Sequence, residues 1–155
     1  MKKVIVSLSG GMDSITLASF YLSKGYEVYP VSFFYGSKHN VHELIAAESF
    51  CKKNNLQFKK INLPFIEQLF KSDLLKTGGE IPEGYYTAPN MSQTVVPGRN
   101  IIFASIMAGY AWSIGANIIS LGVHAGDHTI YEDCRPEFIA AMNAAIVCGS
   151  GNRVY

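Results

Sequence analysis

The opening of the chain constrains the fold more than any other segment. Residues Val4 to Leu8 form a short, apolar, β-branched run that Gly10 and Gly11 stop abruptly, which is typical of a buried strand rather than a helix. From Asp13 to Lys24, apolar residues recur at helical spacing, and a glycine follows as a stop signal. A buried strand, a glycine turn and an amphipathic helix in succession predict an α/β fold with parallel strands.

The rest of the chain continues this alternation. We expect further strands at 27–35, 56–63 and 117–123, and helices at 41–53, 65–75, 101–114 and 136–147. The helix at 101–114 is apolar nearly all round, so its stripe from Ile101 to Trp112 is predicted to be core. Repeated glycines and prolines between residues 64 and 97 predict a long, functional loop after the helix at 65–75. The last three residues, Arg153 to Tyr155, look like the opening of a fifth strand.

Composition limits the classes of protein that fit. The length of 155 residues suits one domain, spanning 1–155, and 48% hydrophobic residues exclude a disordered chain. A net charge of +1 argues against binding nucleic acid through bulk positive charge. No apolar run is long enough to cross a membrane. The odd number of cysteines, Cys51, Cys134 and Cys148, predicts a reducing compartment, so we expect a cytoplasmic protein.

The loop Ser9-Gly10-Gly11-Met12-Asp13-Ser14 is predicted to bind phosphate. Glycines let backbone N–H groups approach oxygens closely, and the following helix adds its positive end. The alternative is an ordinary turn in which Asp13 or Ser14 caps the helix. The loop does not match the Walker pattern of P-loop proteins, because no lysine follows the glycines. It also does not match the dinucleotide-binding fingerprint G-x-G-x-x-G.

Three further segments narrow the phosphate chemistry. They are Ser32-Phe33-Phe34-Tyr35-Gly36-Ser37-Lys38-His39, Val96-Pro97-Gly98-Arg99-Asn100, and Gly122 to His128 with Tyr131 and Asp133-Cys134-Arg135-Pro136-Glu137-Phe138. With the loop S-G-G-x-D-S, and in this order, they resemble the 7-cyano-7-deazaguanine synthase (QueC) family of the N-type ATP pyrophosphatase (PP-loop) superfamily. The resemblance covers essentially the whole chain.

The resemblance implies both a fold and a reaction. The fold would be a Rossmann-like parallel sheet of the adenine-nucleotide α-hydrolase (HUP) type, with strand order 3-2-1-4-5 and the last strand incomplete. The enzyme would be a ligase that forms a C–N bond in queuosine biosynthesis. It would use ATP and Mg²⁺ to convert 7-carboxy-7-deazaguanine and ammonia to 7-cyano-7-deazaguanine through an adenylated intermediate.

The resemblance also suggests roles for individual residues. ATP would contact Leu8, Ser9, Gly10, Gly11, Met12, Asp13, Ser14, Ile15, Thr16, Leu17, Ala18 and Arg99. The catalytic candidates are Asp13, Lys38, His39 and Arg99, and the substrate-binding candidates are Asn100, His124, Asp127, Tyr131, Asp133, Arg135 and Phe138. Arg99 would stabilise charge on the α-phosphate or the substrate carboxylate. Simpler alternatives are an Arg99 that pairs within a loop, an Asp127 in an ordinary turn, and aromatic residues that only pack.

The chain departs from the family in one respect. Members carry a cysteine-rich zinc segment near their C-terminus, and the three cysteines here do not reproduce its spacing. We therefore predict no metal site within the chain, a C-terminal truncation, and completion by a homodimer or a second chain. The rival interpretations are a tRNA-modifying ATP pyrophosphatase and an inactive ATP-binding fragment. Neither a membrane nor a direct nucleic-acid partner is expected.

Overall fold

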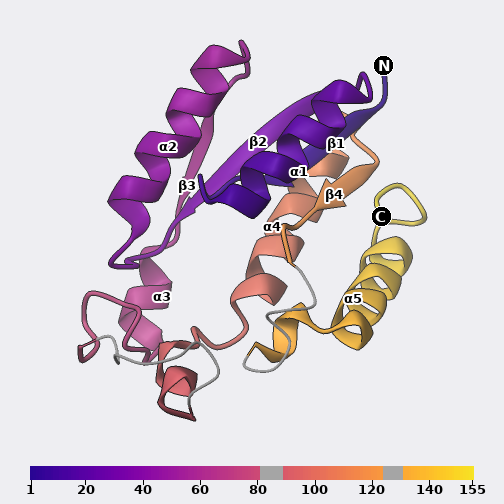
Figure 1. Cartoon of the computed structure of the whole chain (residues 1–155). Helices are drawn as coiled ribbons and strands as arrows, with labels where there is room; N and C mark the ends of the chain where they lie inside the picture. Colours follow the sequence, from indigo (N-terminus) through magenta and orange to yellow (C-terminus); the bar gives the residue numbers. More distant parts are fainter. Residues whose placement is uncertain (81–88, 124–130) are drawn as a thin grey trace.

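A four-stranded parallel sheet forms the centre of the computed structural model, which describes residues 1–80, 89–123 and 131–155. The strands are β1 (Lys3–Ser7), β2 (Glu27–Phe34), β3 (Lys59–Asn62) and β4 (Ile118–Ser120). Their spatial order is β3-β2-β1-β4, and every neighbouring pair is parallel (Figure 1). The predicted Rossmann-like order is therefore confirmed for the first four strands.

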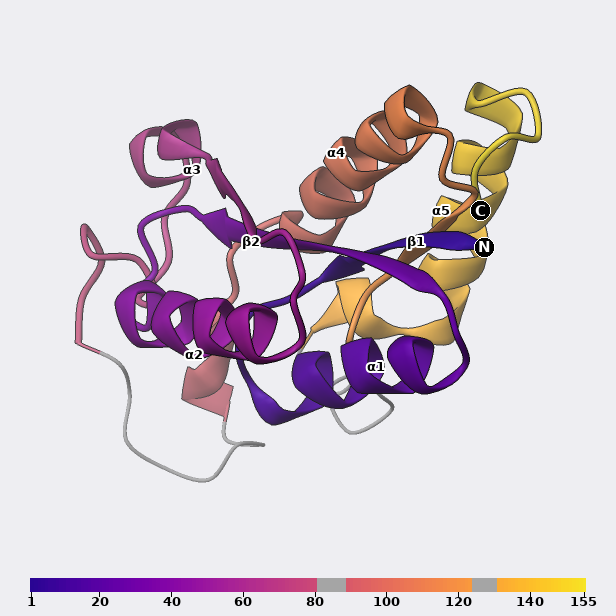
Figure 2. The same ribbon diagram turned by 90° about the horizontal axis from the view of Figure 1, so that it is seen from above.

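Helices cover both faces of this sheet. They are α1 (Met12–Ser23), α2 (Asn40–Lys53), α3 (Pro64–Leu69), α4 (Arg99–Ile114) and α5 (Pro136–Gly149), with 3-10 turns η1 (Pro89–Thr94) and η2 (Glu132–Cys134). Helices α1 and α2 lie on one side and α3 and α4 on the other, while α5 lies at the β4 end of the sheet (Figure 2). In the described part of the chain, no helix is both long and apolar enough to cross a membrane.

The apolar first strand is explained by burial on both faces. Val4 and Val6 belong to the core cluster shared with α1 and α2, whereas Ile5 belongs to the cluster shared with α4. All three side chains are 0% exposed. A strand that helices cover on both faces has a sequence of consecutive hydrophobic residues.

The end of the chain lies along the outer edge of β4. The backbone N–H of Tyr155 donates to the carbonyl of Asn117 at 2.8 Å, and the N–H of Ile119 donates to the carbonyl of Tyr155 at 2.9 Å. This alternation is the pattern of parallel pairing. Tyr155 thus occupies the position of the predicted fifth strand, next to β4.

The helix predicted at 65–75 is shorter in the structure. It ends at Leu69, and Phe70 is already extended, with ψ of 146°. The following segment instead pairs with the turn after β2, where the N–H of Lys38 donates to the carbonyl of Leu74 and the N–H of Lys76 donates to that of Gly36. These tertiary hydrogen bonds replace the helical ones that local sequence favoured.

Helix α4 is buried on one face only, so the prediction of a core stripe from Ile101 to Trp112 is wrong in part. Phe103, Met107 and Ala111 pack against the sheet. Ile101 and Trp112 are 47% and 50% exposed. The helix lies in an outer layer, and only the side that faces the sheet loses contact with solvent.

Candidate functional site

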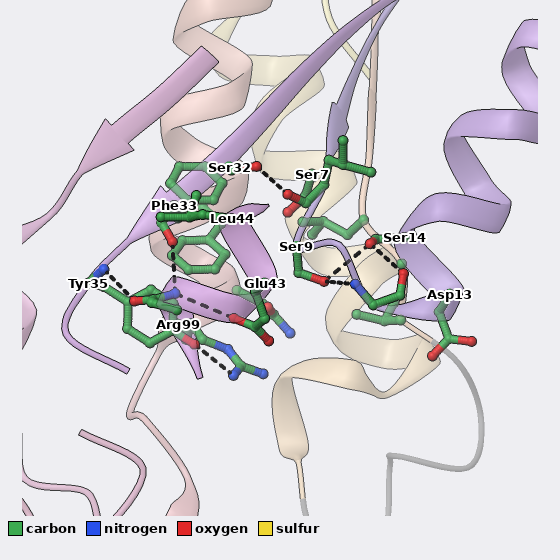
Figure 3. Close-up of a pocket in the computed structure, with 18 of the residues that line it drawn as sticks. Ser7, Ser9, Asp13, Ser14, Ser32, Phe33, Tyr35, Glu43, Leu44 and Arg99 are labelled. Carbon is green, nitrogen blue, oxygen red and sulfur yellow. Dashed lines mark hydrogen bonds between the residues drawn. The ribbon is translucent and has the colours of Figure 1, made fainter. Parts of the chain in front are cut away.

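A cavity of about 250 Å³ opens at the carboxyl ends of β1, β2 and β4 (Figure 3). Its wall consists of Ser7, Leu8, Ser9, Gly11, Asp13, Ser14, Ser32, Phe33, Tyr35, Asn40, Glu43, Leu44, Arg99, Asn100, Phe103, Leu121, Gly122, Val123 and Cys134. In open parallel sheets this edge is where ligands bind, because loops and helix N-termini converge there. The glycine loop lies on one side of the cavity, and Arg99 lies on the other.

Gly10 gives the loop its shape. Its φ of +93° lies in the region that side chains disfavour, and a Cβ built there would lie 2.2 Å from the carbonyl oxygen of Glu43. The loop therefore packs directly against the backbone of α2. Only glycine satisfies both the positive φ and this close approach.

The loop hydroxyls hold its glycines in place. Ser14 Oγ accepts from the N–H of Gly10 at 3.2 Å and donates to the carbonyl of Gly11 at 2.9 Å. Ser9 Oγ accepts from the N–H of Gly11 at 3.2 Å and lies 3.1 Å from Ser14 Oγ. Helix α1 starts after Gly11 without a side-chain cap, and the N–H groups of a first helical turn have no carbonyl partners within the helix. The Gly10 and Gly11 amides and the Ser14 hydroxyl thus donate within the loop, so a phosphate would bind at the α1 N-terminus and replace these internal acceptors.

Arg99 supplies a fixed positive charge opposite the loop. Its Nη1 donates to the hydroxyl of Tyr35 at 3.5 Å, and its guanidinium lies 5.8 Å from the ring centre of Tyr131. Burial by itself would lower the pKa of Arg99, but Tyr35 and Asp133 outweigh burial and raise it. The guanidinium therefore stays charged while it is half-buried, as a site for a phosphate or a carboxylate requires.

Asp133 caps α4 from a distant segment of the chain. Its Oδ2 accepts from the backbone N–H of Asn100 at 2.9 Å, and the side-chain amide of Asn100 donates to the carbonyl of Asp133 at 3.1 Å. This reciprocal pair ties η2 to the first turn of α4 and so fixes where Arg99 begins that helix. The structure thus gives Asp133 a positioning contact, whereas its suggested contact with the substrate stays a prediction.

Substitution of Asp133 separates these two roles. Asp133→Ala removes the acceptor for the Asn100 N–H, so we expect it to destabilise the fold by about 0.5–2 kcal/mol, the range measured for helix caps. Asp133→Asn keeps an acceptor and should unfold close to the wild type in a chemical denaturation experiment. An Asp133→Asn protein that is stable but has lost affinity for the substrate would instead support direct substrate recognition.

Among the residues of this site that the sequence analysis missed, two polar ones belong to the first turn of α2. Asn40 is buried, and its Oδ1 accepts from the N–H groups of Tyr35 and Ser37, each at 3.0 Å. Its Nδ2 donates to the carbonyl of Phe33 at 3.2 Å and to Glu43 Oε2 at 3.4 Å. Asn40 therefore shapes the turn after β2 and orients Glu43 toward the cavity. The available signal was Asn followed three positions later by Glu at a helix start, a spacing typical of capping pairs.

Glu43 is a carboxyl group in a partly buried position. Burial raises its pKa, and this effect outweighs the opposing influence of His39, Arg99 and the hydrogen bond from Asn40. Figure 3 shows its side chain beside Arg99, on the cavity wall. A carboxyl group with a raised pKa can exchange a proton more readily near neutral pH than an ordinary glutamate can.

Some predicted residues meet at the cavity and others do not. Leu8, Ser9, Gly11, Asp13, Ser14, Arg99 and Asn100 line it. Lys38 Nζ instead donates to the carbonyls of Asp73 (2.7 Å) and Gly79, and His39 is exposed at the start of α2. Neither of them lines the described part of the cavity. Their catalytic roles stay predictions.

The other predicted residues have varied positions. Met12 is 80% exposed, whereas Ala18 is buried in the core and Ile15 and Leu17 pack against the same cluster. Tyr131 lies under Arg99. Arg135 forms an exposed ion pair with Glu132, and Phe138 is half-buried on α5. His124 and Asp127 lie outside the described residues.

No metal-binding cluster is found in the part of the chain that the structure describes. Across residues 1–80, 89–123 and 131–155, no three His, Cys, Asp or Glu side chains are grouped to hold an ion. Cys51 is buried on α2, Cys134 is buried in η2 and Cys148 is exposed on α5. These cysteines therefore do not fit the zinc site that the family resemblance implies.

Comparison with known families and curated proteins gives a consistent result. The family described as "Queuosine biosynthesis protein QueC" matches residues 3–155. Proteins named 7-cyano-7-deazaguanine synthase are similar to this chain, with 49% identity over 97% of it in Desulfotalea psychrophila and 47% over 93% in Caldicellulosiruptor bescii. The aligned regions represent 68% and 65% of those two proteins. The chain thus spans about two thirds of the length of these relatives.

Solved structures confirm the fold at low sequence identity. A structure described as a predicted subunit of tRNA methyltransferase from Methanocaldococcus jannaschii has a TM-score of 0.57 and 17% identity, over 100% of this chain and 67% of its own. A 4-thiouridine synthetase in complex with RNA and ATP has the same TM-score and identity, over 92% of this chain and 34% of its own. At this level of identity, the likeness concerns the arrangement of strands and helices alone.

Proposed function

This chain belongs to the QueC family of queuosine biosynthesis proteins, and on that premise we propose that it takes part in 7-cyano-7-deazaguanine synthesis. In this reaction, ATP activates the carboxylate of 7-carboxy-7-deazaguanine and ammonia supplies the nitrogen of the nitrile. The names of the aligned relatives support the reaction class. A ligase that forms a C–N bond is the corresponding enzyme type.

The observation that carries the proposal is the shared cavity of the glycine loop and Arg99. The leaving pyrophosphate of ATP would bind at Gly10 to Ser14, next to the α1 N-terminus. Its oxygens would replace the Ser9 and Ser14 hydroxyls as acceptors for the Gly10 and Gly11 amides. The α-phosphate would then lie farther into the cavity, toward Arg99. The guanidinium would stabilise negative charge that develops as the substrate carboxylate attacks the α-phosphate.

The chemistry requires two activations of the same carbon. The first transfers AMP to the carboxylate, and ammonia displaces AMP to give an amide. The second transfers AMP to the amide oxygen, and loss of AMP gives the nitrile. Mg²⁺ bound by the ATP phosphates would offset their charge, and exposed Asp13 in the first turn of α1 is the loop residue suited to contact the ion.

Pyrophosphate release tests the proposal directly. The protein is mixed with ATP and Mg²⁺, with and without 7-carboxy-7-deazaguanine, and pyrophosphate is measured over time. We expect release that depends on the 7-deazaguanine, and nitrile formation once an ammonium salt is added. ATP binding without substrate-dependent release would contradict the proposal and support an inactive nucleotide-binding fragment.

A further inference from the structure

Glu43 lies on the cavity wall near both the phosphate loop and Arg99. Its backbone carbonyl oxygen would lie only 2.2 Å from a Cβ at Gly10, so the residue is anchored next to the phosphate loop. Figure 3 shows its side chain between Arg99 and Ser9 of the loop. A substrate held between the loop and Arg99 is therefore next to Glu43.

The side chain is oriented by a buried partner. Asn40 is almost fully buried, and its Nδ2 donates to Glu43 Oε2 at 3.4 Å while its Oδ1 is occupied by two backbone N–H groups. These backbone contacts fix the Asn40 amide, and it can only donate to the glutamate. Asn40 therefore stabilises the carboxylate form of Glu43, which is the form able to accept a proton.

The proposed reaction must remove every proton from the incoming nitrogen. When ammonia attacks the acyl adenylate, a C–N bond forms, the C–O bond to AMP breaks, and the nitrogen loses one proton to become a neutral amide. When the amide oxygen attacks a second ATP, pyrophosphate leaves and the nitrogen loses another proton. Elimination of AMP then breaks the C–O bond, removes the last proton and forms C≡N. No oxidation or reduction occurs, but a base must accept a proton in each step.

We propose that Glu43 is the general base that accepts these protons from nitrogen, a role that rests on the proposed function. Each proton passes to a Glu43 oxygen and then to water as AMP or pyrophosphate departs. The groups facing Glu43 are His39 and Asn40 on its own helix and Arg99 from α4, while Asp13 and Ser14 of α1 line the same cavity. Burial raises its pKa above that of an ordinary glutamate, so the protonated form is also accessible during turnover.

Glu43→Gln tests this role because the first activation by ATP and the later reaction with ammonia can be measured separately. The amide has the same shape and can still accept from Asn40, but it cannot take a proton. With ATP and 7-carboxy-7-deazaguanine but no ammonia, we expect pyrophosphate release within about twofold of wild type. After an ammonium salt is added, formation of amide and nitrile should fall about 100-fold, at the lower end of the range for lost general-base catalysis.

Glu48→Gln is the matched control, because Glu48 is an exposed glutamate on the same helix and outside the cavity wall. It should leave both partial reactions unchanged. Product formation by Glu43→Gln at the wild-type rate would overturn the proposal. The proposal would also be overturned if Glu43→Gln showed a raised KM for ATP and released the first pyrophosphate as slowly as it formed product. That result would assign Glu43 to nucleotide or Mg²⁺ binding. Absence of substrate-dependent pyrophosphate in the wild type would contradict the proposed function itself.

The pH dependence provides a second readout. The fraction of ammonium present as free NH3 also rises with pH, so the total ammonium concentration is adjusted to hold free NH3 constant. The base works only when deprotonated, so the wild-type rate of amide formation should then rise with pH through the pKa of Glu43 and level off. Because burial raises that pKa, the rise should occur above the pH at which an ordinary glutamate titrates. Glu43→Gln should lack this rise. A rise of the same size in both proteins would count against Glu43.

Stability distinguishes loss of the base from misfolding. Burial raises the pKa of Glu43 on folding, so ionised Glu43 lowers the free energy of unfolding. This loss of stability exists only above the pH at which the glutamate titrates in the unfolded chain. Glu43→Gln should therefore melt at the same or a higher temperature than wild type at neutral pH, and the difference should shrink on acidification. A lower melting temperature at neutral pH would overturn the assignment of Glu43 as a desolvated base.

Discussion

Gly10→Ala is expected to destabilise the protein strongly and to abolish pyrophosphate release. The φ of Gly10 is +93°, and holding alanine in such a conformation costs about 1–3 kcal/mol. The new methyl group would also lie 2.2 Å from the carbonyl oxygen of Glu43 and 2.9 Å from the N atom of Ala47. Both atoms are backbone atoms of α2, so relief requires moving the helix, which adds about 1–3 kcal/mol. Urea denaturation measures the loss of stability, and the pyrophosphate assay measures the loss of activity.

Gly11→Ala is the matched control for stability, because it places the same methyl group one residue later. Gly11 has a φ of −71°, which alanine adopts freely, and the nearest atom to its Cβ position is Ser9 Oγ at 3.4 Å. We expect a change in unfolding free energy within about 0.5 kcal/mol of zero. Equal destabilisation by the two substitutions would show that the contact with α2 does not determine the conformation of the loop.

The sheet and the phosphate loop were predictable because their signals are local. Val4 to Leu8 is apolar at every position since helices cover both faces of β1, and that pattern is visible without knowledge of the fold. The loop is one continuous segment between a strand and a helix, so its donors are brought together by sequence alone. The order of strands followed from parallel pairing and from the family resemblance.

Other features depend on contacts between distant segments and left little local trace. The helix predicted to reach residue 75 ends at Leu69 because residues 74 and 76 pair with the turn after β2. Glu43 was missed because its placement depends on how closely α2 packs on Gly10. For Asp133, a contact with the substrate stays a prediction, and the structure adds a contact with the N–H of Asn100 that the sequence did not indicate. In each case, tertiary packing determines which group the side chain meets.

Substitution of Arg99 is the second change with a large expected effect. Arg99→Met keeps an unbranched side chain of similar length but removes the charge and the donor to the Tyr35 hydroxyl. Because Arg99 is the cation of α4 that faces the phosphate loop across the cavity, we expect substrate-dependent pyrophosphate release to fall by about 10²–10³-fold. Arg99→Lys keeps a charge but lacks the planar fork, so its rate should lie between those of wild type and Arg99→Met. Steady-state pyrophosphate release measures all three proteins.

Arg153→Met is the control for loss of an arginine. Arg153 packs 5.0 Å from the ring centre of Trp112, donates to the carbonyl of Ser150, and lies outside the cavity wall. Its substitution should leave pyrophosphate release unchanged. A fall in rate equal to that of Arg99→Met would show that the effect arises from a general loss of stability rather than from the cavity.

Arg99→Met should also change the titration of Glu43, because the two side chains lie beside each other (Figure 3). The positive charge of Arg99 lowers the pKa of Glu43 and so opposes the effect of burial. Without that charge the pKa rises further, because ionised Glu43 loses a favourable neighbour. The rise of amide formation with pH should therefore shift to higher pH in Arg99→Met, while Arg99→Lys should retain a profile close to wild type. An unshifted profile in Arg99→Met would mean that Arg99 and Glu43 do not act on the same reacting group.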